Sequence, residues 1–290
     1  MTTPEPLGLI AGGGLMPIRV ADAAQKTGRP VFCVLVEGYA NPADYARFPH
    51  EVVALGRIGR MMELLHTHCV VDLVLAGRVT RPSLLTFRFD AEGARLLAKL
   101  GRRAIFGGDD GLLSAVLNTL RDLGFRPTGA QQVLGELLVE AGLLTTRAPD
   151  GIARADIARG IRVARALGEA DVGQGCVVQA GMVLALEAIE GTDAMLARCG
   201  PLRRDGPGGV LVKLVKPRQD IRVDLPAIGA ETVRNATAAG LAGIAFEARQ
   251  HHAGTLVLDR AAMIQAAEDA GLFLLALRPD EFLQDHGDPP

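Results

Sequence analysis

The sequence predicts an α/β protein with two domains: an N-terminal Rossmann-like domain built on a parallel sheet, and a C-terminal α/β domain with a mixed sheet. In the first half, short apolar runs alternate with segments of helical spacing, which is typical of a doubly wound sheet. In the second half, two apolar runs follow each other almost directly, which indicates a hairpin. We expect the N-terminal domain at 1–128, a linker region at 129–155, the C-terminal domain at 156–279 and a disordered tail at 280–290.

Composition limits the class of protein. The chain has 290 residues, of which 49% are hydrophobic, so it can bury substantial cores. A formal charge of -2 with scattered basic residues argues against nucleic-acid binding. The four cysteines show no CxxC spacing and are expected to be buried thiols, and neither a signal peptide nor an apolar run of roughly 18 residues is present. We therefore expect a cytoplasmic protein.

The N-terminal elements follow each other in regular alternation. In order they are strand Leu7–Ala11, helix Leu15–Thr27, strands Val31–Val36 and Val52–Leu55, helix Gly59–His68, strand Val71–Ala76, and helices Ala91–Leu100 and Asp110–Leu123. Ligands of such sheets bind beyond the carboxyl ends of the strands. The turns after Ala11 and Ala76 are therefore candidate binding segments.

The first of these turns is rich in glycine. A strand, then Gly12, Gly13 and Gly14, then a helix resembles the anion-binding start of a dinucleotide fold. The GxGxxG spacing fails, however, because position 17 is Pro17. Close approach of the backbone to a ligand is favoured over a purely structural turn, and both are favoured over NAD binding. Arginines in the second turn suit a diphosphate, although a surface location would also explain them. The candidate substrate-binding residues here are Gly12, Gly13, Gly14, Leu15, Arg78, Thr80 and Arg81.

The C-terminal elements have a different rhythm. After a helix at Ala130–Ala141, which suits either a dimer contact or a core, they are helix Ile157–Leu167, strands Cys176–Ala180 and Val183–Ile189, helix Gly191–Arg198, strands Val210–Val215 and Ile221–Leu225, helix Glu231–Ala239, strands Gly243–Glu247 and Thr255–Leu258, helix Arg260–Ala270 and strand Leu272–Leu277.

Charged residues gather on one face of the predicted strand Ile221–Leu225. Alternation places Asp220, Arg222 and Asp224 on the same face, with Lys213 and Lys216 just upstream. Two carboxylates beside basic groups suit Mg²⁺ and phosphate chemistry. An ordinary strand with a solvated charged face explains the same pattern, and the pattern alone favours that explanation.

Two further segments add polar candidates. Glu187 and Glu190 are predicted to point to opposite faces of one strand, so at most one shares a site with Asp193, and we favour Glu190. Thr192 and Asp193 also form a good helix start. Gln174 lies between two glycines, where a loop residue and a phosphate-binding backbone are both possible.

Taken together, the motifs resemble the LpxI family, UDP-2,3-diacylglucosamine pyrophosphatases of lipid A biosynthesis. The resemblance covers Leu7 to about Leu277, and only Ala248–Gly254 departs from it, being longer than expected. The segments that carry it are LIAGGG with Pro17, AGRV before Arg81-Pro82, GDD at 108–110, DVGQ at 171–174, EAIEGTD at 187–193 and QDIRVDLP at 219–226.

The resemblance implies hydrolysis of the pyrophosphate bond with a divalent metal, Mg²⁺ or Mn²⁺, giving UMP and 2,3-diacylglucosamine 1-phosphate (lipid X), with the lipid held between two domains. The catalytic candidates are Asp224, Asp220, Lys213, Lys216 and Arg222. Asp224, Asp220, Glu190 and Asp193 are the metal-ligand candidates, and Gln174 and Gln219 join the substrate-binding residues.

Two other classes of protein compete with this hypothesis: a nicotinamide-dependent oxidoreductase, suggested by the Rossmann-like half, and a non-catalytic nucleotide or lipid carrier. The broken GxGxxG spacing counts against the oxidoreductase. A membrane-derived substrate is compatible with transient contact at the inner-membrane surface, and a homodimer is compatible with the apolar helices.

Overall fold

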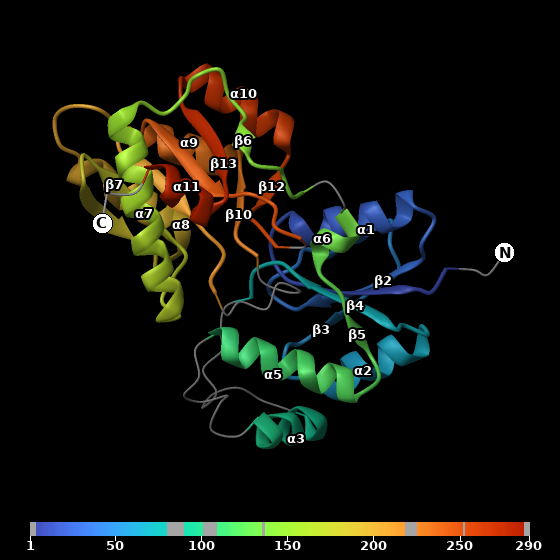
Figure 1. Ribbon diagram of the computed structural model, residues 1–290. Helices are drawn as coiled ribbons and strands as arrows, with labels where there is room; N and C mark the ends of the chain where they lie inside the picture. Colours follow the sequence, from blue (N-terminus) through green and yellow to red (C-terminus); the bar gives the residue numbers. More distant parts are fainter. Residues whose placement is uncertain are drawn as a thin grey trace. The chain divides into compact units, whose positions relative to one another are not determined.

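The computed structural model describes residues 4–79, 90–100, 109–134, 137–217, 225–251 and 253–286, without the side chains of 96–100 and 109–115. The described residues form two compact units, which divide near residue 135. Each unit has a β-sheet of its own (Figure 1).

The N-terminal unit confirms the predicted Rossmann-like parallel sheet. Its described strands have the order β3-β2-β1-β4-β5, and every pairing is parallel. The strands are β1 Leu7–Ala11, β2 Val31–Val36, β3 His50–Val53, β4 Asp72–Ala76 and the short β5 Arg126–Pro127. The helices are α1 Met16–Lys26, α2 Ile58–Thr67, α3 Ala91–Leu100, α5 Asp109–Asp122 and α6 Ala130–Leu134, with a 3-10 turn η1 at Pro42–Tyr45.

Strand alternation divides the N-terminal core into two layers. Leu7, Leu9 and Ala11 of β1 face a cluster that includes α1 and α6. Residues of β2 and β4 such as Phe32 and Leu73 face α2 and α5 instead. The order of the strands reverses between β1 and β4, which is the switch point where such sheets bind ligands.

The C-terminal unit has the predicted mixed sheet, with the order β6-β13-β11-β9-β7-β8. Strands β9 (Val210–Lys213), β11 (Gly243–Glu247) and β13 (Phe273–Leu277) are parallel, and β7 (Gly175–Gln179) and β8 (Met182–Leu186) form the predicted hairpin. The short β6 (Gly142–Leu143) pairs antiparallel with β13. A separate pair joins β10 (Ala227–Gly229) to β12 (Leu256–Leu258).

Helices cover both faces of the mixed sheet. α8 (Gly191–Cys199), α9 (Ala230–Ala238) and α10 (Arg260–Ala270) pack on one face, and α7 (Gly151–Glu169) and α11 (Pro279–His286) pack on the other. Leu211 of β9 faces the first group and Val212 the second. Lys213 follows in this alternation on the side of α8.

The structure corrects three local predictions. The tail predicted at 280–290 forms helix α11 up to His286, because Phe282 is buried against the core of α7. The helix predicted at Ala130–Ala141 ends by Leu134 in the described residues. Residues 137–139 are not helical: the Leu137 carbonyl oxygen accepts a hydrogen bond from the Val257 amide, and Leu138 forms a bridge with Leu256. Cys69, predicted to be buried, is exposed, whereas the other cysteines are buried.

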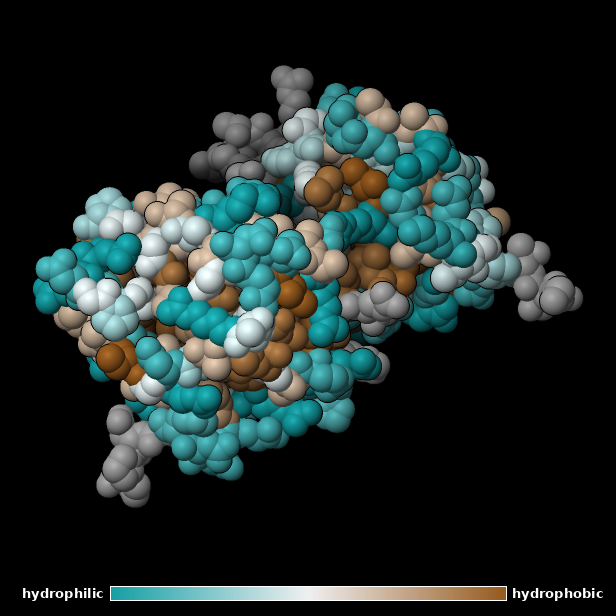
Figure 2. Space-filling model, turned by 90° about the horizontal axis from the view of Figure 1, so that it is seen from above, coloured by the Kyte–Doolittle hydropathy of each residue, from teal (hydrophilic) through white to brown (hydrophobic). Residues whose placement is uncertain are grey.

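No helix among the described residues is both long and apolar enough to cross a membrane. Figure 2 shows one face of the chain, on which hydrophobic residues stand in small groups among hydrophilic ones. The large apolar side chains with the highest exposure in the described part are Ile189, at 97%, and Leu15, at 67%. Both lie in segments that the sequence marks as candidate binding sites.

Candidate active site

Several predicted site residues lie outside the described residues, so the structure leaves their roles as predictions. The predicted charged strand lies outside them too, apart from its last residue, Leu225. The predicted site residues outside the described part are Thr80, Arg81, Gln219, Asp220, Arg222 and Asp224.

In the N-terminal unit, the two candidate turns at the switch point lie against each other. Gly13 and Arg78 exchange backbone hydrogen bonds of 2.9 and 2.8 Å. A Cβ on Gly12 would lie 2.7 Å from the Arg78 carbonyl oxygen, and a Cβ on Gly77 would lie 2.7 Å from the Gly12 carbonyl carbon. Close packing of the two backbones therefore requires these two glycines, independently of any ligand.

The next residues of the same turn are more open. Gly14 has φ +95°, and no atom lies within 4 Å of a Cβ placed on it. Leu15 precedes α1 without a side-chain cap on the helix. The uncapped amides at the start of α1 are compatible with the predicted anion binding. The structure thus brings Gly12, Gly13, Gly14 and Arg78 together, and their binding role stays a prediction.

In the C-terminal unit, a buried polar cluster joins Glu187, Thr192 and Lys213. Thr192 Oγ1 donates to Glu187 Oε1 at 2.6 Å and accepts from Lys213 Nζ at 2.5 Å. Glu187 Oε1 lies 3.8 Å from Lys213 Nζ. Glu187 and Lys213 are both only 5% exposed. This places the predicted catalytic Lys213 in contact with Glu187, a carboxylate that was not favoured by the sequence pattern.

The sheet register explains how these side chains meet. Gly175 of β7 lies opposite Lys213 of β9, and on its other side the Glu187 amide donates to the Gly175 carbonyl oxygen at 2.9 Å. A Cβ on Gly175 would lie 2.6 Å from Glu187 Oε2. The Glu187 carboxylate therefore occupies the space over Gly175 that a side chain would fill, next to Lys213.

Lys216, three residues after Lys213 in the sequence, is held by an ion pair. Lys216 Nζ donates to Asp171 Oδ1 at 2.9 Å, and Asp171 belongs to the same DVGQG segment as Gln174 and Gly175. The Gln174 carbonyl oxygen accepts from the Leu214 amide at 2.9 Å, which ties this segment to the end of β9. The side-chain oxygen of Gln174 is buried and has no hydrogen-bond partner among the described residues.

Glu190 and Asp193, the predicted metal ligands that the structure describes, have other contacts. Glu190 forms a 2.6 Å ion pair with Arg198, and Asp193 Oδ1 accepts from Asn235 at 3.0 Å. The pKa of Glu190 is lowered, first by its own backbone amide and then by Arg198. The predicted placement of Glu187 and Glu190 on opposite faces of one strand is wrong, because β8 ends at Leu186.

The described residues alone do not fit a metal ion. Across residues 4–286, leaving out the undescribed gaps, no group of three or more His, Cys, Asp or Glu side chains could hold one. Thr192 does not cap α8 as predicted, because the helix already begins at Gly191 with Glu190 at the N-cap position, and the Thr192 hydroxyl donates to Glu187 instead. Metal binding therefore stays a prediction that depends on Asp220 and Asp224.

Burial keeps two cysteines out of nucleophilic chemistry. It raises the pKa of Cys33 to about 12 and that of Cys176 to about 12. A thiol with so high a pKa stays protonated at neutral pH and is a poor nucleophile.

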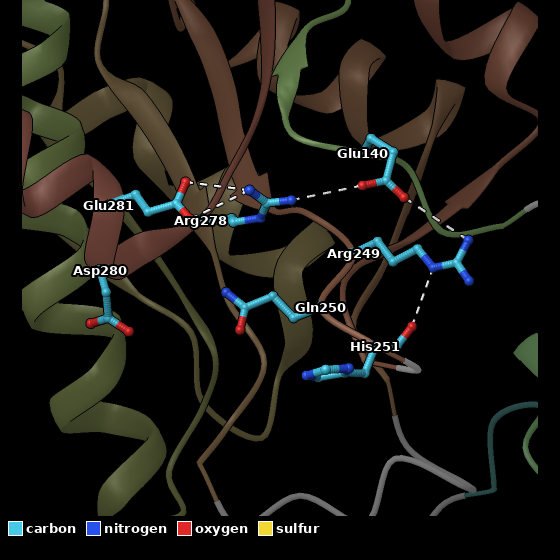
Figure 3. Close-up of a pocket in the computed structure, with 7 residues that line it drawn as sticks. All are labelled: Glu140, Arg249, Gln250, His251, Arg278, Asp280 and Glu281. Carbon is cyan, nitrogen blue, oxygen red and sulfur yellow. Dashed lines mark hydrogen bonds and ion pairs between the residues drawn. The ribbon is translucent and has the colours of Figure 1, made fainter.

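A cavity of about 430 Å³ lies beyond the carboxyl ends of β11 and β13 (Figure 3). Arg249 and Arg278 both face Glu140, at 4.0 and 3.9 Å, and Arg278 also pairs with Glu281 at 3.4 Å. These side chains are 41 to 69% exposed. Each guanidinium already faces a carboxylate, and the lining includes the loop that departs from the family pattern. The buried cluster around Lys213 is therefore a better candidate for the active site than this cavity.

Comparisons with known proteins agree with the motifs. Residues 6–137 match the LpxI N-terminal domain, and residues 140–275 match the LpxI C-terminal domain. A protein of Caulobacter vibrioides, UDP-2,3-diacylglucosamine pyrophosphatase LpxI, is 41% identical over 281 residues, which cover 95% of this chain and 98% of that protein. Both halves of the chain and nearly the full length of the relative are matched, so this chain belongs to the LpxI family.

Proposed function

We propose that this chain hydrolyses the pyrophosphate bond of UDP-2,3-diacylglucosamine in lipid A biosynthesis, giving UMP and 2,3-diacylglucosamine 1-phosphate. The observation that carries the proposal is the 41% identity to the Caulobacter pyrophosphatase along 95% of the chain. In this reaction a water oxygen bonds to phosphorus as the phosphorus–oxygen bond of the anhydride breaks. The negative charge that develops on the phosphoryl oxygens requires fixed cations or donors.

The basic groups that follow one another at the end of β9 support this chemistry. Lys213 and Lys216 stand at the end of β9, and the chain then leads directly into the segment that carries Asp220, Arg222 and Asp224. We assign Lys213, Lys216 and Arg222 to charge stabilisation, and Asp224 to orienting the attacking water, with Asp220 beside it. The exposed Ile189 of the same unit is an apolar side chain that an acyl chain of the substrate would cover.

The nucleotide end is assigned to Gly12–Leu15 and to the turn that begins at Arg78. That turn lies at the switch point of the N-terminal sheet, where doubly wound folds bind nucleotides. We place the reaction at the cytoplasmic surface of the inner membrane. Transient contact with the bilayer would be seen as co-sedimentation with lipid vesicles.

The direct test is release of UMP from UDP-2,3-diacylglucosamine by the purified full chain. We expect Asp224→Ala to lower turnover by about two orders of magnitude or more while the chain stays folded, since it would remove the group that orients the water. Asp205→Ala, which changes an exposed carboxylate of the same unit, is the control. Near-normal turnover of Asp224→Ala would remove Asp224 from the mechanism, and absence of UMP release by the wild-type chain would reject the function.

Metal dependence is tested in the same assay. If Mg²⁺ or Mn²⁺ is required, excess EDTA should abolish UMP release, and either ion should restore it. Full activity in the chelator would show that the reaction proceeds without a dissociable metal.

A further inference from the structure

The buried cluster of Glu187, Thr192 and Lys213 is arranged as a relay. The single Thr192 hydroxyl uses its proton toward Glu187 and a lone pair toward Lys213, at 2.6 and 2.5 Å. The direct separation of the two charges, 3.8 Å, is longer than a hydrogen bond. Thr192 therefore couples the carboxylate to the ammonium and fixes the direction of the Lys213 side chain.

Stability alone is a weak explanation for this cluster. Moving a carboxylate and an ammonium out of water costs several kcal/mol each, and replacing buried ion pairs by apolar side chains is often neutral or stabilising. Glu187 Oε2 is buried and has no hydrogen-bond partner among the described residues, so part of this cost is not offset there. Buried polar groups left in this state are commonly found at functional sites.

The backbone around Glu187 is shaped to accept its carboxylate. A Cβ on Gly173 would lie 2.0 Å from the Glu187 carbonyl oxygen, and a Cβ on Gly175 would lie 2.6 Å from Glu187 Oε2. Neither glycine has a positive φ, so these positions require glycine for space. By contrast, Glu190, three residues further on, has its ion pair with Arg198 at an exposed position.

We propose that Glu187 is a positioning residue of the active site, which acts through the Thr192 hydroxyl to hold the Lys213 ammonium where phosphoryl oxygens of the substrate bind. The proposal rests on the proposed function and assigns its electrostatic step to a preorganised group. Charge stabilisation in a transition state depends on fixed geometry, and a shift of about 1 Å can cost roughly 100-fold in rate. Loss of the relay therefore lowers kcat much more than it changes KM.

The experiment compares variants at Thr192 and Glu187 in the UMP-release assay. Thr192→Val keeps the shape of the side chain and removes the hydroxyl, whereas Thr192→Ser keeps the hydroxyl. We expect Thr192→Val and Glu187→Ala to lower kcat about 10- to 100-fold with KM changed less than about threefold, and Thr192→Ser to retain most of the activity. The double variant should be no slower than the slower single variant, because both changes break one relay.

The matched control is Thr237→Val, which removes a hydroxyl that donates within α9, to the Val233 carbonyl oxygen at 2.8 Å. Thermal unfolding of every variant distinguishes a variant that has lost its fold from one in which only the Lys213 ammonium is misplaced. Folded Thr192→Val with wild-type kcat, or equal losses in Thr192→Val and Thr192→Ser, would overturn the proposal while leaving the function intact. A wild-type chain that releases no UMP would overturn the proposed function and the relay together.

Discussion

At the scale of single residues, the position of Glu187 depends on two places where a side chain is missing. Gly173 and Gly175 leave room for the carbonyl and the carboxylate of Glu187, and the register of β7 and β9 then sets that carboxylate beside Lys213. The sequence-based prediction favoured Glu190, and it placed Glu187 and Glu190 on one strand that in the structure ends at Leu186. Only the register across three strands shows that Glu187 and Lys213 meet over a glycine.

Gly173→Ala tests this dependence on space. The added methyl group would meet backbone atoms of Glu187 at 2.0 and 2.8 Å, and backbone cannot rotate away as a side chain can. We expect a loss of about 1–3 kcal/mol in the free energy of unfolding, measured by urea denaturation. Gly200→Ala is the control, because no atom lies within 4 Å of its added Cβ and its φ is -49°. A Gly173→Ala chain as stable as Gly200→Ala would show that the segment shifts without cost.

At the scale of elements, helix α7 holds the turn of the β7–β8 hairpin through one buried carboxylate. Asp156 is 1% exposed and accepts from the amides of Ala180 and Gly181 at 2.8 and 2.6 Å. Both turn residues have positive φ, 47° and 77°, as a type I′ hairpin turn requires. Ala180 is an unfavourable residue for that conformation, so the hydrogen bonds from Asp156 help to fix the turn.

Asp156→Ala should therefore destabilise the chain more than the loss of an ordinary helix cap. Removing the acceptor of two amide hydrogen bonds is expected to cost about 2–3 kcal/mol. Asp150→Ala removes the N-cap of the same helix, where Asp150 accepts from Ala153 at 2.8 Å, and should cost about 1 kcal/mol. Urea denaturation of both variants gives the comparison. If Asp156→Ala were the milder change, the hairpin turn would not depend on α7.

The elements also show which parts of the fold can be predicted from local sequence patterns. Strands β1, β2 and β11 and helix α10 lie at the predicted residues, since their apolar spacing and flanking glycines are local signals. The non-helical run at 137–139 and helix α11 were missed, because their conformations depend on partners distant in sequence, β12 and the core of α7. The resemblance to LpxI depended on the same kind of local motif, whereas the choice between Glu187 and Glu190 required the fold.

At the scale of the whole molecule, each unit carries a carboxyl group with a shifted pKa, and the two groups make stability depend on pH in opposite directions. In the N-terminal unit, a hydrogen bond from Arg126, with Arg29 as a second partner, lowers the pKa of Asp72. In the C-terminal unit, burial raises the pKa of Glu247, although its Oε2 accepts from the Val215 amide at 2.9 Å. A chain built from two units need not unfold in a single transition, so these contributions are separable.

The directions of the two effects follow from proton linkage. Asp72 binds its proton more weakly in the folded state, so its stabilising contribution is complete above the unfolded pKa and is lost as the pH falls through the folded pKa. Glu247 binds its proton more tightly in the folded state. The C-terminal unit therefore loses stability as the pH rises from the unfolded pKa of Glu247 through its higher folded pKa.

Glu247→Gln isolates the second effect, because glutamine keeps an oxygen acceptor for Val215 and cannot ionise. We expect the variant and the wild-type chain to have similar stability near pH 4, and the variant to become the more stable of the two as the pH approaches about 7. Hydrogen exchange of the β9 and β11 amides reports the C-terminal unit, with exposed Glu231→Gln as the control. Parallel pH dependence of Glu247→Gln and the wild-type chain would mean that Glu247 ionises without cost. A difference that grows with pH would identify Glu247 as a partly buried acid that destabilises its unit at neutral pH.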